Sequence, residues 1–292
     1  MALGKYKKWI IINFIVIALI VGMQFVLMFT TSIERVYKFM LFDNFFLNNA
    51  IIMVFWALAP IIGSFVANFF EKFLLWGHTK FMGKKVIFGM GEEGSEKTFK
   101  FSFSKLFFPA LMAVNFTMAL WNNQYLQEFI LINTSLEDPE HALLAQVMMA
   151  GPLFVITIVI SVILFTPAYI MVDSGIVYTN KEKIMKSRHT VEVKSVSNFY
   201  LNFLKGYAGI GVLINLYIFF ADAINEALSS PAFGFGPFMG LVLWSILPFL
   251  VSFLMLPMVL ILDKTYEKRI QKMLKYASKL GIIDKKIQVI ID

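Results

Sequence analysis

Cysteine is absent from this chain of 292 residues, so disulfide bonds, thiolate catalysis and cysteine-ligated metal sites are excluded. Charge is also scarce, because charged side chains make up 15% of the residues and hydrophobic ones 59%. The resulting mean hydropathy of +0.73 is too high for a soluble domain of this length. These shortages predict an integral membrane protein.

Groups able to carry out acid–base or metal chemistry are equally few. The three histidines, His78, His141 and His189, fall in predicted loops on both faces of the membrane and cannot converge on one metal ion or one catalytic base. No acidic pair lies at membrane depth. Residues 89–94 match G-x-G-x-x-G, but their two glutamates would repel a pyrophosphate, and a hairpin turn is the better interpretation. We therefore predict no enzyme activity, no catalytic or metal-binding residues and no cofactor.

Long hydrophobic runs are what the chain has instead. Six apolar segments, each near the ~20 residues needed to cross a bilayer, cover residues 9–30, 49–70, 105–122, 145–171, 200–221 and 238–262. The third is short and contains Pro109 and Asn115, so a re-entrant helix is the alternative. Charge favours a crossing, because otherwise an acidic loop would be cytoplasmic and the basic loop 172–199 would be outside.

The distribution of positive charge orients all six segments. Of the 26 lysines and arginines, only Arg35 and Lys38 lie between segments on one side, and the other 24 lie on or at the edge of the opposite side. The positive side is the cytoplasmic side of a cell membrane, so both termini are expected in the cytoplasm. The net charge of +7 then sits on one membrane face, which favours anionic lipid headgroups as partners and not nucleic acid. Asn133 begins a weak glycosylation sequon on the outer side.

The predicted fold class is an all-α membrane protein with a small cytoplasmic β element. Residues 1–262 form a six-helix transmembrane bundle of three hairpins, with cytoplasmic loops at 71–104 and 172–199. In the first loop, alternating apolar residues predict a β-hairpin that pairs residues 84–88 with 97–104. The second loop repeats the alternation, so the two loops could build a small sheet.

The cytoplasmic tail, residues 263–292, is predicted to begin with a basic amphipathic helix. From Tyr266 to Leu280, apolar residues recur at helical spacing, and lysines and Arg269 fill most of the other face. Such a helix either lies on anionic headgroups or docks on the protein's own cytoplasmic sheet. Residues 286–291 could add a final strand.

Candidate functional residues fall into three groups. Basic residues at the cytoplasmic surface are candidate contacts for lipid headgroups: Lys105, Lys205, Lys264, Lys268, Arg269 and Lys272. Small residues would let helices approach closely: Ala59, Gly63, Ala67, Gly206, Gly209 and Gly211. Asn115 and Asn215 either join helices by hydrogen bonds or line a path for a neutral substrate. The lack of a charged residue in the cores favours hydrogen bonding.

Two functions from different classes remain open. The first is a non-catalytic scaffold or accessory subunit that docks membrane lipids and a partner protein, or a second copy of itself, through the basic cytoplasmic face. The alternative is a transporter or channel for a neutral or lipidic substrate.

Overall fold

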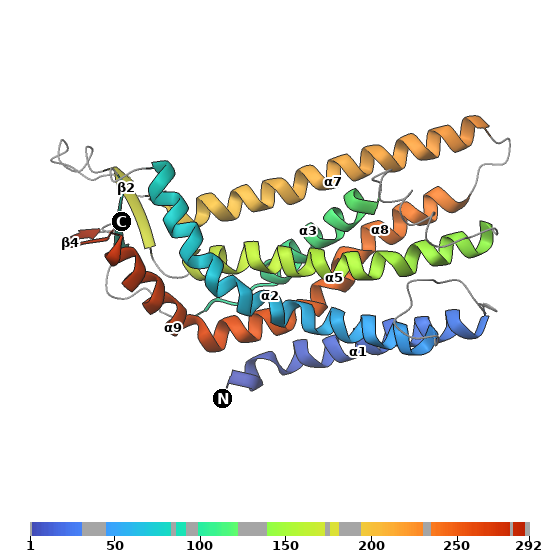
Figure 1. Ribbon diagram of the computed structural model, residues 1–292, viewed down its shortest axis with the longest axis horizontal. Helices are drawn as coiled ribbons and strands as arrows, with labels where there is room; N and C mark the ends of the chain where they lie inside the picture. The colour runs from blue at the N-terminus through green and yellow to red at the C-terminus, as the bar shows by residue number, and fades with distance from the viewer. Residues whose placement is uncertain are drawn as a thin grey trace. The chain divides into compact units, whose positions relative to one another are not determined.

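The computed structural model describes residues 2–30, 45–82, 86–91, 99–121, 139–172, 176–180, 194–229, 235–280 and 283–289. Helices dominate these ranges (Figure 1): α1 Ala2–Thr30, α2 Phe45–Met82, α3 Ser104–Trp121, α5 Pro139–Val172, α7 Val196–Ser229, α8 Phe235–Leu254 and α9 Leu256–Lys279. The strands are β1 Val86–Gly91, β2 Ile176–Asn180, β3 Lys194–Ser195 and β4 Ile283–Val289.

Four helical segments among the described residues are long and apolar enough to cross a membrane. They are Ala50–Gly77, Gly151–Val172, Tyr200–Ala221 and Trp244–Lys279, the last of which joins the end of α8 to α9. The other two predicted segments also fall within helices, because α1 contains residues 9–30 and α3 covers nearly all of 105–122. The chain is therefore a helical protein whose apolar helices are compatible with membrane insertion.

The second predicted segment is longer than the sequence indicated. Helix α2 does not stop near residue 70 but continues to Met82, so the expected loop 71–104 begins as helix. The extension keeps an apolar stripe, since Leu75 is buried and Phe73 and Trp76 are exposed on the other side. A helix that retains a buried face has no reason to end at the membrane boundary.

The strands form one four-stranded sheet with the order β3-β2-β1-β4. Strand β1 pairs antiparallel with β2, with Val86 opposite Asn180 and Met90 opposite Ile176. It also pairs parallel with β4, with Phe88 opposite Ile283 and a register irregularity before Met90. Strand β3 adds the fourth position through Val177 opposite Ser195. The sheet thus joins both loops to the tail.

The hairpin predicted within the first loop is wrong. Strand β1 pairs with β2 and β4, and Gly89 and Gly91 lie inside it and not in a turn. Residues 99–103 do not form a strand, and α3 starts directly after them at Ser104. The alternating phenylalanines instead include Phe99, whose buried ring packs edge-on against Tyr266 with the ring centroids 5.9 Å apart.

The described chain divides into two compact units that share several helices. Unit 1 comprises Met1–Pro60, Leu106–Ser161 and Tyr207–Leu256, and unit 2 comprises Ile61–Lys105, Val162–Gly206 and Pro257–Asp292. Unit 2 therefore contains the sheet and nearly all of α9.

Unit 1 is held together by interhelical contacts of aromatic and small polar side chains. The Trp56 indole N–H donates to the Gly151 carbonyl at 3.0 Å, and its ring meets Phe154 edge-on. Glycine at 151 permits this approach of α2 to α5, because a Cβ there would lie 3.0 Å from Ile52. The hydroxyls of Thr117 and Thr157 join α3 to α5 at 2.7 Å.

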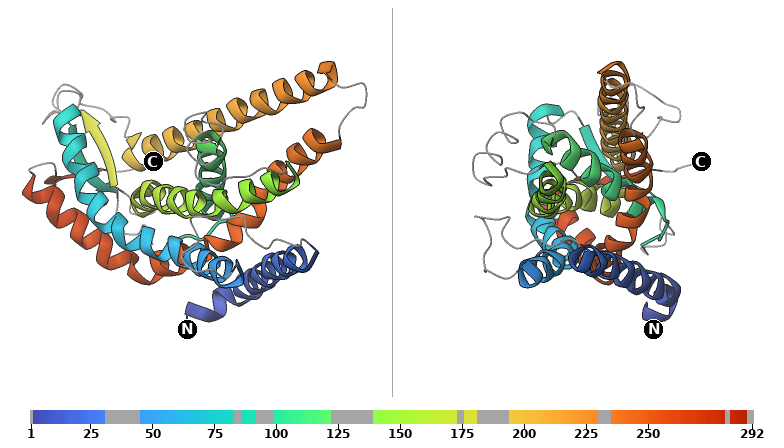
Figure 2. Two further views of the ribbon diagram at one scale, coloured as in Figure 1. Left: turned by 45° about the vertical axis from the view of Figure 1, so that its right-hand side comes forward. Right: turned by 90° about the vertical axis from the view of Figure 1, so that its right-hand side faces the viewer.

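The core of unit 2 is formed by α5 and by the buried stripe of α9. Phe165 and Tyr169 on α5 are completely enclosed. From Val259 onward the buried apolar residues of α9 recur every three or four positions: Val259, Leu262, Tyr266, Ile270, Met273 and Ala277. Helix α9 runs beside the C-terminal half of α2 (Figure 2), where Arg269 contacts Ser64 and Glu71. The apolar face of α9 is therefore covered by protein and does not lie on headgroups.

Candidate functional site

The outward face of α9 carries a stripe of five exposed lysines. Lys264, Lys268, Lys272, Lys275 and Lys279 recur every three or four residues, so they share one side of the helix. Three of them, Lys264, Lys268 and Lys272, are candidate headgroup contacts that the structure leaves accessible. Because the opposite face of α9 is buried in unit 2, this surface can meet a partner through its ammonium groups and their aliphatic stems but not through the apolar stripe.

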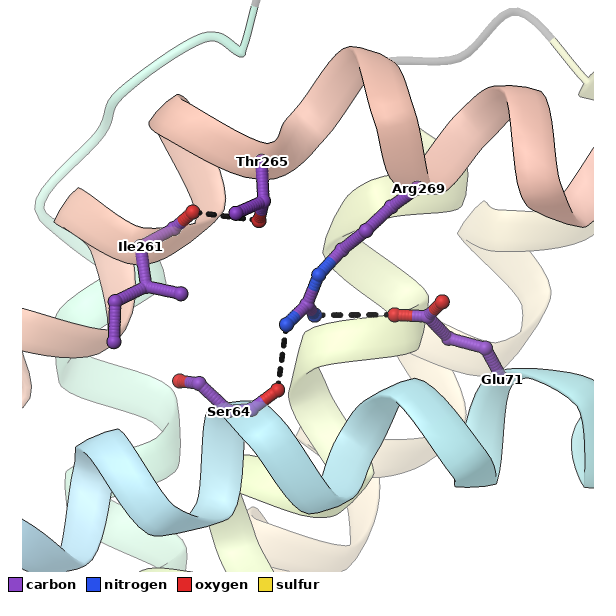
Figure 3. A network of polar contacts seen from close by, with 5 residues as sticks. All are labelled: Ser64, Glu71, Ile261, Thr265 and Arg269. Atoms are coloured by element: carbon purple, nitrogen blue, oxygen red, sulfur yellow. Dashed lines mark hydrogen bonds and ion pairs between the residues drawn. The ribbon is translucent and has the colours of Figure 1, made fainter.

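Arg269 does not belong to this exposed stripe. Only 2% of its surface is exposed, and its guanidinium points toward α2 (Figure 3). One terminal nitrogen lies 3.1 Å from the Glu71 carboxylate and the other donates to the Ser64 carbonyl at 2.6 Å. A guanidinium engaged in this way holds two helices together and is not presented to a lipid headgroup.

Lys105 is buried as well, at the start of α3. Its ammonium donates to the Lys100 carbonyl and lies over the Phe99 ring, 4.2 Å from the centroid. The Tyr169 ring lies 5.9 Å from the same ammonium. Desolvated cation–π contacts stabilise a buried lysine, which explains why this charge is tolerated next to apolar helices. Lys205, the other lysine predicted at the cytoplasmic end of an apolar segment, is half-buried. Neither has the exposure of the α9 lysines.

The two candidate path residues, Asn115 on α3 and Asn215 on α7, bind each other. The Asn215 amide donates to the Asn115 side-chain oxygen at 2.8 Å and to its backbone carbonyl at 3.3 Å. The Asn115 amide donates in turn to the carbonyls of Leu111 and Ala208. Both side chains are at most 2% exposed. This arrangement is an interhelical clamp, and it leaves the Asn215 side-chain oxygen as a buried acceptor with no partner among the described residues.

The small residues predicted to allow close helix packing differ in their surroundings. On α2, Ala59, Gly63 and Ala67 are all buried. On α7, a Cβ at Gly211 would lie 3.1 Å from the Asn115 Cβ, whereas one at Gly206 or Gly209 would meet nothing within 4 Å. Gly211 is therefore the glycine that permits close packing of α7 against α3, and Gly206 and Gly209 face outward.

Metal chemistry finds no support among the described residues, since no group of three or more histidine, cysteine or acidic side chains there could hold an ion. His78 and His141 lie in α2 and α5 and not in loops as predicted. His189 and the sequon residue Asn133 lie outside the described ranges.

The sequence does not indicate the buried Arg269–Glu71 pair, whereas Asn13, a polar residue within the first apolar segment, is expected to form an interhelical hydrogen bond. The Asn13 amide on α1 donates to the Phe253 carbonyl at the end of α8. For Arg269, the signal was its place beside the apolar stripe, about 60° from Tyr266 on a helix of 3.6 residues per turn.

Comparisons with protein-family models, curated proteins and solved structures give no match for this chain.

Proposed function

We propose that this chain is a multi-pass integral protein of the cell membrane with both termini in the cytoplasm. It acts as a non-catalytic scaffold or accessory subunit that docks anionic lipids, or the acidic surface of a partner protein, through a basic cytoplasmic face. The observation that carries the proposal is the division of α9 into a buried apolar stripe and an exposed stripe of five lysines.

The geometry of α9 limits how that docking can occur. An interfacial helix normally inserts its apolar face between headgroups, but Tyr266, Ile270 and Met273 are already buried within unit 2. What remains is electrostatic attraction, worth about 1 kcal/mol for each lysine near an anionic surface. Such docking is reversible and sensitive to ionic strength.

The test measures attraction between the full-length protein and anionic vesicles. The protein is placed in nanodiscs of phosphatidylcholine, and its association with vesicles containing phosphatidylserine is followed by flotation. Replacing Lys264, Lys268 and Lys272 by glutamate is expected to weaken association at least about 100-fold, because about 3 kcal/mol of attraction is lost. Raising the salt concentration is expected to weaken the association of the unchanged protein with these vesicles as well.

The matched control replaces the same three lysines by arginine, which keeps the charge and is expected to bind as the unchanged protein does. Association that survives the glutamate replacements and resists salt would contradict the role of this stripe. If the glutamate replacements weaken association with an acidic partner protein but not with vesicles, the stripe docks a protein and not lipid.

The transport alternative depends on Asn115 and Asn215, and their mutual hydrogen bonding supports the scaffold instead. A path for a neutral substrate needs accessible polar groups, whereas these two are enclosed. We expect no flux of neutral solutes in proteoliposomes. Should flux occur, its loss in both Asn115→Leu and Asn215→Leu variants that remain folded would support the alternative.

A further inference from the structure

An exposed hydroxyl lies at the edge of the lysine stripe of α9. The helix contains two residues of the serine–threonine type, Thr265 and Ser278. The Thr265 hydroxyl donates to the Ile261 carbonyl at 2.6 Å (Figure 3), and its side chain is half-buried. Ser278 is exposed. Of these two hydroxyls, the one at Ser278 is therefore accessible to a modifying enzyme.

Lysines flank Ser278 both in the sequence and on the surface of the helix. Lys275 lies three residues earlier and Lys279 is the next residue, and both are exposed. Residues three apart are neighbours on a helix surface, so Ser278 and Lys275 lie about 60° apart around α9. A phosphate on Ser278 would therefore lie within reach of the Lys275 ammonium. A basic residue near the serine is also a charge pattern by which kinases select substrates.

The place of Ser278 along α9 favours modification as well. The helix ends at Lys279, and the Leu280 N–H donates to the Tyr276 carbonyl at 3.0 Å to close the last turn. A terminal turn opens at a lower cost in free energy than the middle of a helix. Ser278 can therefore reach the extended conformation in which a kinase binds its substrate, whereas Thr265 lies in the middle of α9.

We propose that Ser278 is a phosphorylation site, and that its phosphate neutralises the last turn of the lysine stripe and weakens the docking of α9 to anionic lipid. This inference rests on the function proposed above, in which the stripe faces the cytoplasm. The reaction requires a serine/threonine kinase and ATP. The Ser278 Oγ forms a bond to the γ-phosphorus of ATP, and the bond from that phosphorus to the bridging oxygen breaks. ADP leaves with the electron pair, and the hydroxyl proton passes to the base of the kinase.

The expected effect follows from the charges of the last turn. A phosphoserine carries a charge of about −1.5 to −2 at neutral pH, which offsets most of the charge of Lys275 and Lys279. The carboxyl end of a helix does not stabilise an anion, so the phosphate is stabilised by these two ammonium groups and withdraws them from lipid. The remaining lysines, Lys264, Lys268 and Lys272, still face outward. Phosphorylation therefore weakens docking without abolishing it.

The test treats the full-length protein in phosphatidylcholine nanodiscs with ATP and a purified kinase that prefers a lysine or arginine three residues before the serine. Mass spectrometry locates the phosphate, and flotation measures association with vesicles that contain phosphatidylserine. We expect phosphate on Ser278 and an association about 10–30-fold weaker than that of the untreated protein, because about 1.5 to 2 charges of attraction are lost.

Ser278→Ala is the matched control, because it removes the hydroxyl and leaves every charge in place. After treatment with kinase and ATP, this variant is expected to associate with the vesicles as strongly as the untreated protein. A kinase that leaves Ser278 unmodified overturns the inference, and so does a protein phosphorylated at Ser278 that associates as before. Failure of the proposed function gives a different result, since the untreated protein would then show no salt-sensitive association with the vesicles at all.

Discussion

Replacement of Arg269 by methionine is expected to destabilise the protein by about 3–5 kcal/mol, because the Glu71 carboxylate stays buried without its partner. In the folded protein both side chains are almost completely enclosed and lie 3.1 Å apart. The same guanidinium also satisfies the Ser64 carbonyl on α2. The measurement is the free energy of unfolding of the full-length protein in a mild detergent.

The control variants compare the removal of one partner of the buried ion pair with the removal of both. Removing one partner leaves an uncompensated charge, whereas removing both leaves an apolar contact, which is often neutral or stabilising. Glu71→Leu should therefore be as damaging as Arg269→Met, and the double variant should recover most of the loss. Lys268→Met, next to Arg269 but exposed, should change stability by no more than about 0.5 kcal/mol. Equal effects of Arg269→Met and Lys268→Met would contradict the ion pair.

The pair also shows which part of the tail could be predicted. Helical spacing in the sequence identifies α9 and its apolar stripe, because periodicity depends only on neighbouring residues. The same spacing places Arg269 at the edge of that stripe. The spacing contains nothing about Glu71, which is 198 positions away in the chain and has the ordinary appearance of an acid at a membrane boundary. Arg269 was therefore assigned to the exposed basic face, although its partner draws it inward.

The strands of the sheet illustrate the same limit. Alternation of apolar and polar residues marks a strand but says nothing of its neighbour, so the first strand was paired with the nearest candidate along the chain. In the structure Phe88 lies opposite Tyr178 in β2 and Ile283 in β4. The phenylalanines before α3 alternate for another reason, since Phe99 is needed against Tyr266 and the Lys105 ammonium. A period of two is not specific to strands when the segment is short.

Glycine spacing on α7 predicted close packing but did not distinguish the glycines that pack from those that face outward. Gly206, Gly209 and Gly211 look alike in the sequence, yet only Gly211 has a neighbour, Asn115, within reach of an added Cβ. The difference arises because the buried face of α7 passes through Ala208 and Asn215. Gly211 lies on that face, one turn before Asn215. Valine in place of Gly211 is therefore expected to change the stability of the protein by a different amount from valine in place of Gly206 or Gly209.

Gly211→Val is expected to destabilise the protein by about 1–3 kcal/mol, because the new side chain would collide with Asn115 and push α7 away from α3. The collision also threatens the Asn115–Asn215 hydrogen bond, worth about 0.6–2 kcal/mol between membrane helices. Gly206→Val and Gly209→Val, which add the same side chain to the same helix, meet nothing within 4 Å and should not lower stability. The free energies of unfolding of the three variants in one detergent provide the comparison.

A second substitution separates the collision from the lost hydrogen bond. Asn215→Ala removes the donor while leaving Gly211 in place, so it should lose only the hydrogen-bond part of the effect. Adding Gly211→Val to Asn215→Ala should then cost less than Gly211→Val alone, because the hydrogen bond it would disrupt is already absent. Fully additive losses would mean that Gly211 and the asparagine pair stabilise the helices independently. Equal losses at all three glycines would show that α7 does not pack on α3 through the face that contains Gly211.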